Sequence, residues 1–309
     1  MKMKREPAIL YDLRKNKSLL LMVFPAVIFF LLFSYIPMGG IVLAFKNLDY
    51  SLGILKSPWV GMANFKFFFQ SGKAFLVTRN TVLYNLAFIC VNTVLNLTVA
   101  ILLSEMTHKV FKKVSQTILL LPYFVSWVVV SAILYNLLNY EYGLINSFLT
   151  FLGREPVDVY GNPGVWKYIL VALNAWKEIG YGSIVYLAAI MGIDREIYEA
   201  SEIDGASAFR QVYYITLPSL RPTIIILILL AIGNVFRGNF GMFYQVIGNN
   251  GTLFNATDVI DTFVFRSLTQ TKEYGMSAAA GFYQSGMCFV ILMLTNYMVK
   301  KVEPDYALF

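Results

Sequence analysis

Long apolar runs separated by shorter polar segments dominate the 309-residue chain. Six of these runs reach the roughly 20 mostly apolar residues that an α-helix needs to cross a bilayer. They cover about 19–45, 78–104, 114–139, 165–190, 215–247 and 278–299. The pattern therefore predicts an all-α integral membrane protein with six transmembrane helices.

The composition supports this fold class. Hydrophobic residues make up 58% of the chain and charged residues only 14%, whereas an ordinary soluble domain carries about 25% charged residues. The net charge of +7 does not indicate a nucleic-acid partner, because the basic residues gather at the ends of the apolar runs. Membrane lipid is the expected surrounding.

The distribution of basic residues predicts an orientation. The N-terminus and the segments that share its side of the membrane hold 14 Lys and Arg, against nine on the other side. The positive-inside rule then places both termini in the cytoplasm. The predicted organisation is a cytoplasmic segment 1–18, a membrane domain 19–300 and a cytoplasmic tail 301–309. Outer loops are expected at about 46–77, 140–164 and 248–277, and a cytoplasmic loop at 191–218.

Two of these loops carry helical patterns. In the outer loop, Val259, Phe263 and Leu268 follow near-helical spacing after Thr257 or Asp258 as a possible N-cap, which predicts a short amphipathic surface helix. In the cytoplasmic loop, apolar residues recur every three to four positions before Gly205 and again from Ala206 to Pro218. Because glycine permits a turn that other residues resist, the prediction is a helix, a bend and a second helix.

The spacing within the cytoplasmic loop is specific. It follows the pattern Glu-Ala-(Ala)-x-x-x-Gly, nine residues, Ile-x-Leu-Pro, here Glu199, Ala200, Ser201, Gly205, Ile215, Leu217 and Pro218. This pattern resembles the signature loop of the membrane subunits of binding-protein-dependent ABC importers, with Ser201 where the family usually has a second Ala. The resemblance implies that the loop is a coupling helix that docks on a cytoplasmic ATPase. Acidic positions such as Asp204 would meet basic residues there.

Three further stretches narrow the resemblance. The beginning YDLRKNKSLLLMVFPAVIFFLLFSYIPMGGIVLAFKNLDY, the segment NFGMFYQVIGNNGTLFNATDVIDTFVFRSL and the ending KKVEPDYALF resemble carbohydrate importer permeases of the oligosaccharide or polysaccharide branch. The resemblance implies the type I permease fold in a prokaryotic cytoplasmic membrane. The implied partners are a second, non-identical permease, two ATP-binding subunits, an extracytoplasmic solute-binding protein and an oligosaccharide.

Residues for catalysis or metal binding do not form a recognisable set in this sequence. No Gly-x-x-x-x-Gly-Lys-Ser/Thr phosphate loop occurs, so ATP and Mg²⁺ are expected on partner subunits and no cofactor in this chain. The single histidine, His108, has no cysteine or carboxylate cluster at metal-ligand spacing around it. We therefore expect a transport subunit and not an enzyme.

Polar groups inside the predicted spans are candidates for the substrate pathway, because charge at membrane depth usually faces a cavity or a partner. If 215–247 is one helix, its polar residues form a stripe at i, i+3, i+7 and i+10. The candidates in the two spans are Asn174, Trp176, Lys177, Glu178, Tyr181, Asn234, Arg237, Phe240 and Tyr244. Hydrogen-bonding and aromatic groups together suit a sugar. Contacts between neighbouring helices are the alternative explanation for the same residues.

Two questions of function stay open at this level. Lys177 and Arg237 could receive an acidic sugar such as a uronate, although Glu178 nearby argues against assuming it. An ion-gradient-driven secondary transporter would also explain intramembrane charges, but it predicts inverted repeats that the sequence does not show. A membrane scaffold without transport would not need polar groups at mid-depth. The preferred hypothesis is an ATP-driven importer that works by alternating access.

Overall fold

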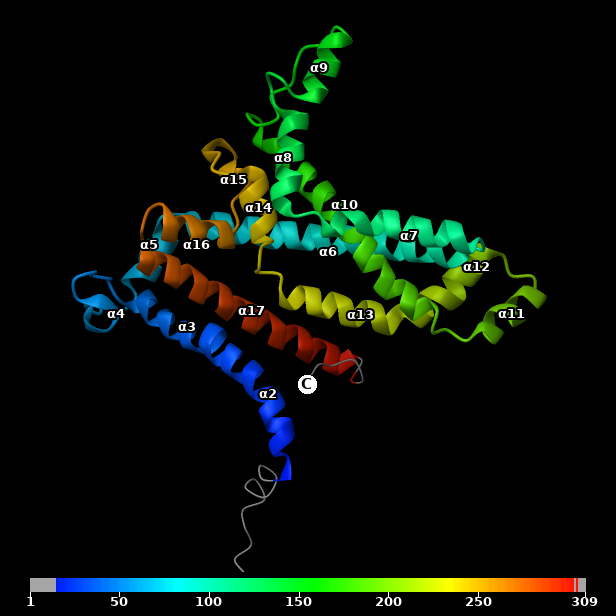
Figure 1. Ribbon diagram of the computed structural model, residues 1–309, viewed down its shortest axis with the longest axis horizontal. Coiled ribbons are helices and arrows are strands. Elements are labelled where there is room, and N and C mark those ends of the chain that lie inside the picture. The colour runs from blue at the N-terminus through cyan, green and yellow to red at the C-terminus, as the bar shows by residue number, and fades with distance from the viewer. Residues whose placement is uncertain (1–14, 303, 305–309) are drawn as a thin grey trace, which may run out of the picture.

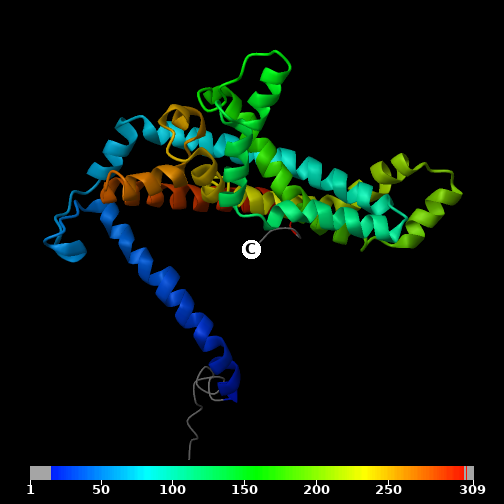
Figure 2. The same cartoon turned by 45° about the horizontal axis from the view of Figure 1, so that its top comes forward.

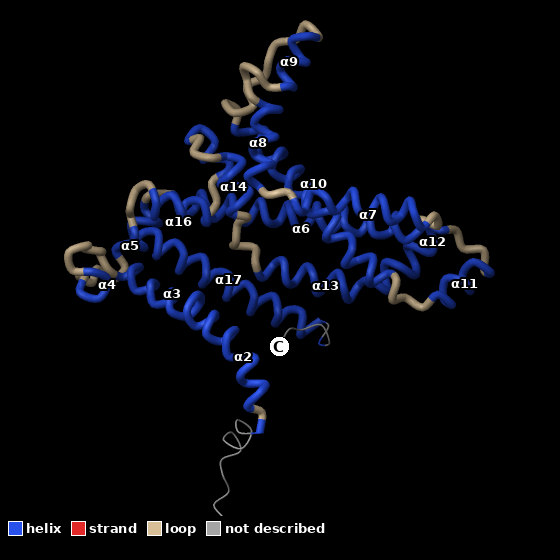
Figure 3. The backbone as a smooth tube through the Cα atoms, viewed as in Figure 1, coloured by secondary structure: helices blue, strands red, loops and turns tan. Residues whose placement is uncertain are grey.

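The computed structural model describes residues 15–302 and 304 of the chain. Nearly all of this part is helical, and its extended residues pair only in an isolated bridge between Lys46 and Trp59. Figure 3 shows the helices joined by short loops. The all-α fold class is confirmed.

Four long helices run along the long axis of the molecule (Figure 1): α6 (Lys73–Glu105), α7 (Lys109–Phe124), α13 (Leu217–Gly233) and α17 (Tyr274–Val302). A fifth, α10 (Pro163–Ile190), crosses this layer and packs mainly on α6 and α7. At about 1.5 Å per residue, the 28 residues of α10 are about 42 Å long, enough to cross a bilayer. These helices form the body of the molecule.

The two ends of this body carry different short elements. One end holds α11 (Arg195–Ile203) and α12 (Ala208–Gln211), followed by the π-turn Val212–Thr216. The other end holds α4 (Gly53–Lys56), α5 (Ala63–Gln70) and α16 (Ile260–Thr269). The segment 191–218 therefore lies at the opposite end from 46–77 and 248–277.

Two parts of the chain project from the body. The run Lys17–Phe45 joins α2 (Lys17–Phe30), the π-turn Leu31–Tyr35, α3 (Ile36–Met38) and the 3₁₀ turn Gly39–Phe45, and it leaves the other helices at an angle in Figures 1 and 2. No residue of α2 is buried. The second projection comprises α8 (Trp127–Leu138) and α9 (Leu144–Phe151), with α14 (Phe240–Ile247) packed against α8.

The core follows α6 along the body. Near its middle, the fully buried side chains of Trp166, Leu170 and Met242 pack in one cluster with Phe88. Toward α12 a second cluster joins α6, α10 and α13. At the far end a third joins α5, α6, α16 and α17. α6 is therefore the helix on which the others are assembled.

The count of six continuous spans is not reproduced in the described residues. By length and apolar composition, four helices there could cross a membrane, or five if α7 and α8 form one bent span. α10 has the required length, but it carries Lys167, Lys177 and Glu178. Residues 114–139 were predicted as one helix, and this is wrong, because α7 and α8 meet at a 92° bend. Ser126 starts the new helix by accepting a hydrogen bond from the Val129 N–H at 3.3 Å.

The prediction of one helix over 215–247 is also wrong. α13 ends at Gly233, and an irregular segment, 234–239, separates it from α14. Asn239 caps α14 by accepting the Met242 N–H at 3.1 Å. Asn239 therefore starts a new helix within an apolar run that was predicted to be continuous.

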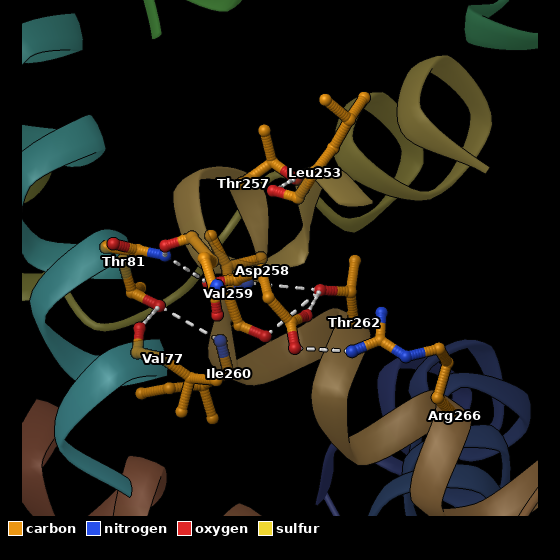
Figure 4. A network of polar contacts seen from close by, with 11 residues as sticks. Val77, Thr81, Leu253, Thr257, Asp258, Val259, Ile260, Thr262 and Arg266 are labelled. Atoms are coloured by element: carbon orange, nitrogen blue, oxygen red, sulfur yellow. Dashed lines mark hydrogen bonds and ion pairs between the residues drawn. The ribbon is translucent and has the colours of Figure 1, made fainter. Parts of the chain in front are cut away.

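The expected amphipathic outer-loop helix exists as α16, although it starts later than predicted. Its Ile260, Thr262, Phe263 and Ser267 are buried. The Asp258 carboxylate accepts a 2.6 Å hydrogen bond from the Thr262 hydroxyl and forms an ion pair with Arg266 (Figure 4). Asp258 therefore joins one turn of α16 to the next, and does not serve as its N-cap.

Candidate coupling and translocation sites

The loop between α10 and α13 has the predicted form of a helix, a bend and a second helix. Asp194 caps α11 by accepting the Glu196 N–H at 3.0 Å. At the other end, Gly205 has φ +76°. The Ala206 N–H reaches back to the Ser201 carbonyl at 2.9 Å, and the Gly205 N–H to the Glu202 carbonyl at 3.0 Å. This is a Schellman stop, which needs a residue in the left-handed region.

The candidate coupling residues divide into two groups. Those on α11 and at the bend are exposed: Glu199, Ala200, Asp204 and Gly205. Ile215, Leu217 and Pro218 lie where the π-turn passes into α13. Ile203 and Phe209 are 88% and 78% exposed on the same end. The end of the molecule thus offers acidic and apolar side chains together, a surface suited to a protein partner.

Ser201, which replaces the usual Ala of the motif, fastens the two helices to each other. Its hydroxyl donates to the Tyr198 carbonyl at 2.7 Å and accepts from the Gln211 side-chain amide at 2.9 Å. The Tyr198 hydroxyl in turn lies 2.9 Å from the Thr216 hydroxyl. These bonds make α11 and α12 one unit attached to the start of α13.

Ser201→Ala tests this attachment. We expect a small loss, because one hydrogen bond of this kind contributes about 1 kcal/mol and alanine still allows close approach. If the loop couples an ATPase to transport, as the resemblance implies, uptake should fall severalfold while the protein remains inserted. Thr98→Ala is the matched control, because the Thr98 hydroxyl donates only to Val94 within its own helix. Equal uptake by Ser201→Ala and the parent would contradict the attachment.

A cavity of about 370 Å³ lies between α6, α10 and α13. Among the predicted pathway residues, Tyr181, Asn234 and Arg237 line it, and Asn234 and Arg237 are exposed. The Tyr181 ring stacks on Tyr123 with centroids 4.7 Å apart. The structure therefore brings together one residue of α10 and two of the segment 234–239, which we call the break loop.

Three asparagines of α6 complete the cavity and were missed by the sequence reasoning: Asn85, Asn92 and Asn96. Their spacing of seven and four residues places them on one face of a helix, and that was the available signal. Among the described residues, the side-chain oxygens of Asn92 and Asn96 are buried and accept no hydrogen bond. Buried acceptors without donors are uncommon. Because these two oxygens have almost no exposed surface, they are turned away from the open part of the cavity.

Five other candidates do not line this cavity. Asn174 is buried and accepts a 2.8 Å hydrogen bond from Asn92, so it supports the lining from behind. Trp176 lines a separate groove of about 1320 Å³ between α6 and α10. Phe240 and Tyr244 stack on each other at 5.1 Å and pack on Phe265. Their expected stripe with Arg237 does not form, because the helix is broken at 234–239. Glu178 is partly buried and lies outside the lining.

Lys177 has a different environment from the one its charge suggested. It is 6% exposed, and its ammonium group donates to the carbonyls of Pro122, Tyr123 and Val125. The last carbonyls of a helix lack their usual partners within it, and at the end of α7 only the Pro122 carbonyl among these three accepts a backbone hydrogen bond, from the Val125 N–H at 3.2 Å. The three donors of one lysine satisfy all three. Lys177 therefore stabilises the bend, and the expectation that it faces the pathway is wrong.

Two glycines let neighbouring helices approach α10 closely. A Cβ atom at Gly180 would lie 2.0 Å from the Leu119 carbonyl oxygen of α7, and one at Gly182 would lie 2.0 Å from the Asn96 side chain. A larger residue at either position would push α7 or α6 away. The geometry of the cavity and of the bend thus depends on the same helix.

The sequence comparisons identify the family. Residues 95–304 match the family model described as binding-protein-dependent transport system inner membrane component. The chain belongs to this family. It is 34% identical to the polygalacturonan/rhamnogalacturonan transport system permease protein YteP of Bacillus subtilis (strain 168), over 98% of this chain and 94% of YteP. It is 28% identical to the trehalose/maltose transport system permease protein MalF of Thermococcus litoralis, over 94% of each chain.

Solved structures agree with this assignment. A chain in the crystal structure of a bacterial ABC transporter involved in the import of the acidic polysaccharide alginate superposes with a TM-score of 0.86 and 30% identity. The match covers 96% of this chain and 100% of that chain. A chain of the alginate transporter in complex with alginate pentasaccharide-bound periplasmic protein gives a TM-score of 0.84.

This protein is therefore a permease of a carbohydrate ABC importer and a multi-pass component of the inner membrane. As a permease subunit it is a transport protein and not itself an enzyme. Neither alternative left open by the sequence, the ion-gradient-driven transporter or the scaffold, is a member of this family. The predicted resemblance is confirmed.

Proposed function

We propose that this permease forms half of the pathway through which an acidic, uronate-containing oligosaccharide is imported by alternating access. The other half would be a second, non-identical permease. Two ATPase subunits would bind ATP and Mg²⁺ at the end that carries residues 199–218, and a solute-binding protein would deliver the sugar at the opposite end. Both chain termini would then lie in the cytoplasm.

The exposure of helix α2 supports the proposal of a second permease subunit. It is apolar, no residue of it is buried, and it extends away from the other helices (Figure 2). A helix in this position is covered either by lipid or by a neighbouring subunit. The exposed mixture of acidic and apolar side chains on α11 and α12 supports an ATPase partner in the same way.

The acidic substrate rests on one observation: the exposed Arg237 side chain is the one charged group in the lining of a cavity whose other polar lining residues are asparagines, tyrosines and Thr93. A guanidinium binds a carboxylate through two parallel hydrogen bonds, and asparagine amides bind hydroxyls. Polygalacturonan and alginate, named for the relatives, are polymers of uronic acids, in which each sugar carries a carboxylate. Lys177 is occupied by backbone carbonyls, so Arg237 is the cation assigned to this role.

Arg237→Gln tests the substrate class. Uptake of acidic and neutral oligosaccharides of equal length is measured in proteoliposomes that contain the whole importer with its binding protein. We expect the preference for the acidic sugar to fall about tenfold, because a charge-assisted hydrogen bond contributes about 1.5–3 kcal/mol.

Arg237→Lys, which keeps the charge but not the paired donors, should retain part of the preference. Arg266→Gln is unsuitable as a control, since it breaks the ion pair with Asp258. Lys167→Gln, an exposed cation near the start of α10, is the better control and should keep the parent preference. Equal uptake of acidic and neutral sugars by the parent importer would refute the acidic substrate.

A further inference from the structure

The break loop, residues 234–239, is irregular backbone between two helices of the membrane domain. Such backbone is tolerated at membrane depth only where it is buried in protein or lines a cavity, because lipid offers no hydrogen bonds. Here it does both. Val235 and Phe236 are buried in the cluster with Val77 and Ile260, while Asn234 and Arg237 face the cavity.

Three side chains from other helices bind the backbone of this loop. The Asp261 carboxylate of α16 accepts the Gly238 N–H at 2.6 Å. The Gln284 amide of α17 donates to the Phe236 carbonyl at 2.7 Å and to the same Asp261 oxygen at 2.9 Å. From α6, the Asn85 amide donates to the Arg237 carbonyl at 3.0 Å. Three consecutive residues of the loop are therefore held by three different helices.

The closeness of this contact depends on glycine at position 238. A Cβ atom there would lie 2.9 Å from the Asp261 carboxylate oxygen and 2.9 Å from a Val259 methyl group. Burial raises the pKa of the Asp261 carboxyl group, and the hydrogen bonds from Gly238 and Gln284 oppose that shift. The two donors therefore favour the carboxylate that they bind.

α16, which carries Asp261, is itself fixed to α6. The Ile260 N–H donates to the Thr81 hydroxyl at 3.0 Å, and the Asn80 amide donates to the Asp258 carbonyl at 3.0 Å. The buried ion pair of Asp258 and Arg266 then joins the first turns of α16 (Figure 4). Asp261 thus extends from a rigid support at the end of the molecule opposite to α11.

We propose that Asp261 and Gln284 are positioning residues that hold the break loop so that Asn234 and Arg237 face the cavity. Through them, any displacement of α16 at its end of the molecule is passed to the cavity lining. The expected effect of Asp261 on the choice between acidic and neutral sugars rests on the proposed function of Arg237. The effect of Asp261 on the conformation of the loop does not. The two can therefore be tested separately.

The first measurement is the conformation of the loop. Asn234→Cys is introduced after Cys90 is replaced by alanine and Cys288 by serine, because the Cys288 thiol hydrogen-bonds to Phe236 and Arg237 of the loop and serine can keep these bonds. The purified whole importer is then treated with a water-soluble maleimide. We expect Asp261→Ala to change the labelling rate of the thiol, because the Gly238 N–H loses its acceptor and the loop relaxes. Asp261→Asn should label like the parent, since its oxygen can accept both hydrogen bonds. Ser285→Ala is the control, because that hydroxyl donates only to Gly281 within α17.

The second measurement is selectivity, in the uptake assay with Asn234 restored. We expect Asp261→Ala to reduce the preference for the acidic over the neutral sugar about tenfold. The double variant, Asp261→Ala with Arg237→Gln, should show the same preference as Asp261→Ala alone. Residues that act through one another are non-additive in this way. A merely structural loss would instead reduce the uptake of both sugars alike.

The outcomes are distinct. Labelling and preference both unchanged in Asp261→Ala would overturn the positioning role. A second outcome is that Asp261→Ala alters the labelling rate but neither Asp261→Ala nor Arg237→Gln reduces the preference for the acidic sugar. This outcome would support the positioning role of Asp261 and refute the role of Arg237 in selectivity. If Asp261→Ala does not assemble with its partners, Gln284→Ala decides, because it removes the bond to Phe236 while Asp261 still accepts from Gly238.

Discussion

Gly205→Val is expected to abolish most ATP-driven uptake while leaving the permease inserted in the membrane. Gly205 ends α11 with φ +76°, a conformation that a β-branched residue adopts only under strain. The strain is about 1–3 kcal/mol, and the chain can relieve it by turning α11 away from α12. A coupling free energy of that size corresponds to about a 5–150-fold change, measured here as sugar uptake per ATP hydrolysed in proteoliposomes.

Two variants isolate the cause. Nothing lies within 4 Å of a Cβ atom at Gly205, so the effect of valine comes from the backbone and not from a clash. Gly205→Asn should therefore keep most of the activity, because asparagine tolerates the left-handed region. Gly53→Val introduces the same strain at φ +68° in the loop at the opposite end, and should leave the coupling of uptake to hydrolysis unchanged.

Copurification of the ATPase subunits completes this test. If α11 docks on an ATPase, Gly205→Val should also weaken the association of the ATPase with the permease. Normal uptake and normal association in Gly205→Val would refute the coupling role of residues 199–218. The loop would then be only a connector between α10 and α13.

Local patterns allowed the elements at the ends of the molecule to be predicted. The bend at Gly205 follows from one residue type that is needed at one backbone angle, so the sequence carries the information directly. The same holds for the existence of α16, where apolar residues at helical spacing were sufficient. What could not be predicted was what its buried face packs on, because Ile260 packs with Val77 and donates to Thr81 on α6, about 180 residues earlier in the chain.

The breaks within apolar runs could not be predicted in the same way. Hydropathy averaged over a whole span hides the bend at Val125 and the break loop, because both are short and lie between long apolar runs. Ser126 and Asn239 are N-cap residue types, but in a membrane span their polar groups can equally bond to neighbouring helices. The distinction depends on whether other helices supply partners for the free backbone groups. Here Lys177, Asp261 and Gln284 supply them.

The lining of the cavity between α6, α10 and α13 was predicted in part for a related reason. Three of the proposed pathway residues, Tyr181, Asn234 and Arg237, line it, although the helical stripe used to select Asn234 and Arg237 does not exist. The asparagines of α6 were missed because each is a single polar residue in an apolar helix. Their meaning appears only when α10 approaches closely enough, at Gly182, to place them beside the break loop.

Both breaks have the same design, in which charged or amide side chains of one helix satisfy the backbone of another. At the bend between α7 and α8, the Lys177 ammonium group donates to backbone carbonyls. At the break loop, the Asp261 carboxylate accepts the Gly238 N–H. Charged groups at membrane depth are therefore poor guides to substrate unless their partners are known. Arg237 remains a candidate because its side chain is exposed to the cavity, whereas Lys177 is not.

Lys177→Met is expected to destabilise the permease without changing which sugar it prefers. Methionine fills a similar volume but leaves the carbonyls of Tyr123 and Val125 without the lysine donor, while the Pro122 carbonyl keeps only the Val125 N–H at 3.2 Å. Each partly buried acceptor left unpaired costs about 1–3 kcal/mol, so the 92° bend between α7 and α8 should loosen. The measurement is the midpoint of thermal unfolding of the purified importer, together with the acidic-over-neutral preference of the variant that still assembles.

The contacts of Lys177 define the controls. Its ammonium group also lies 5.4 Å from the Trp127 ring and 5.8 Å from the Tyr123 ring, so the charge itself adds to the stability of the bend. Lys177→Arg keeps the charge and should lose less stability than Lys177→Met. Lys167→Met removes an exposed cation from the same helix and should lose none. A variant Lys177→Met with unchanged thermal stability and a reduced preference for acidic sugar would show instead that this lysine binds the substrate.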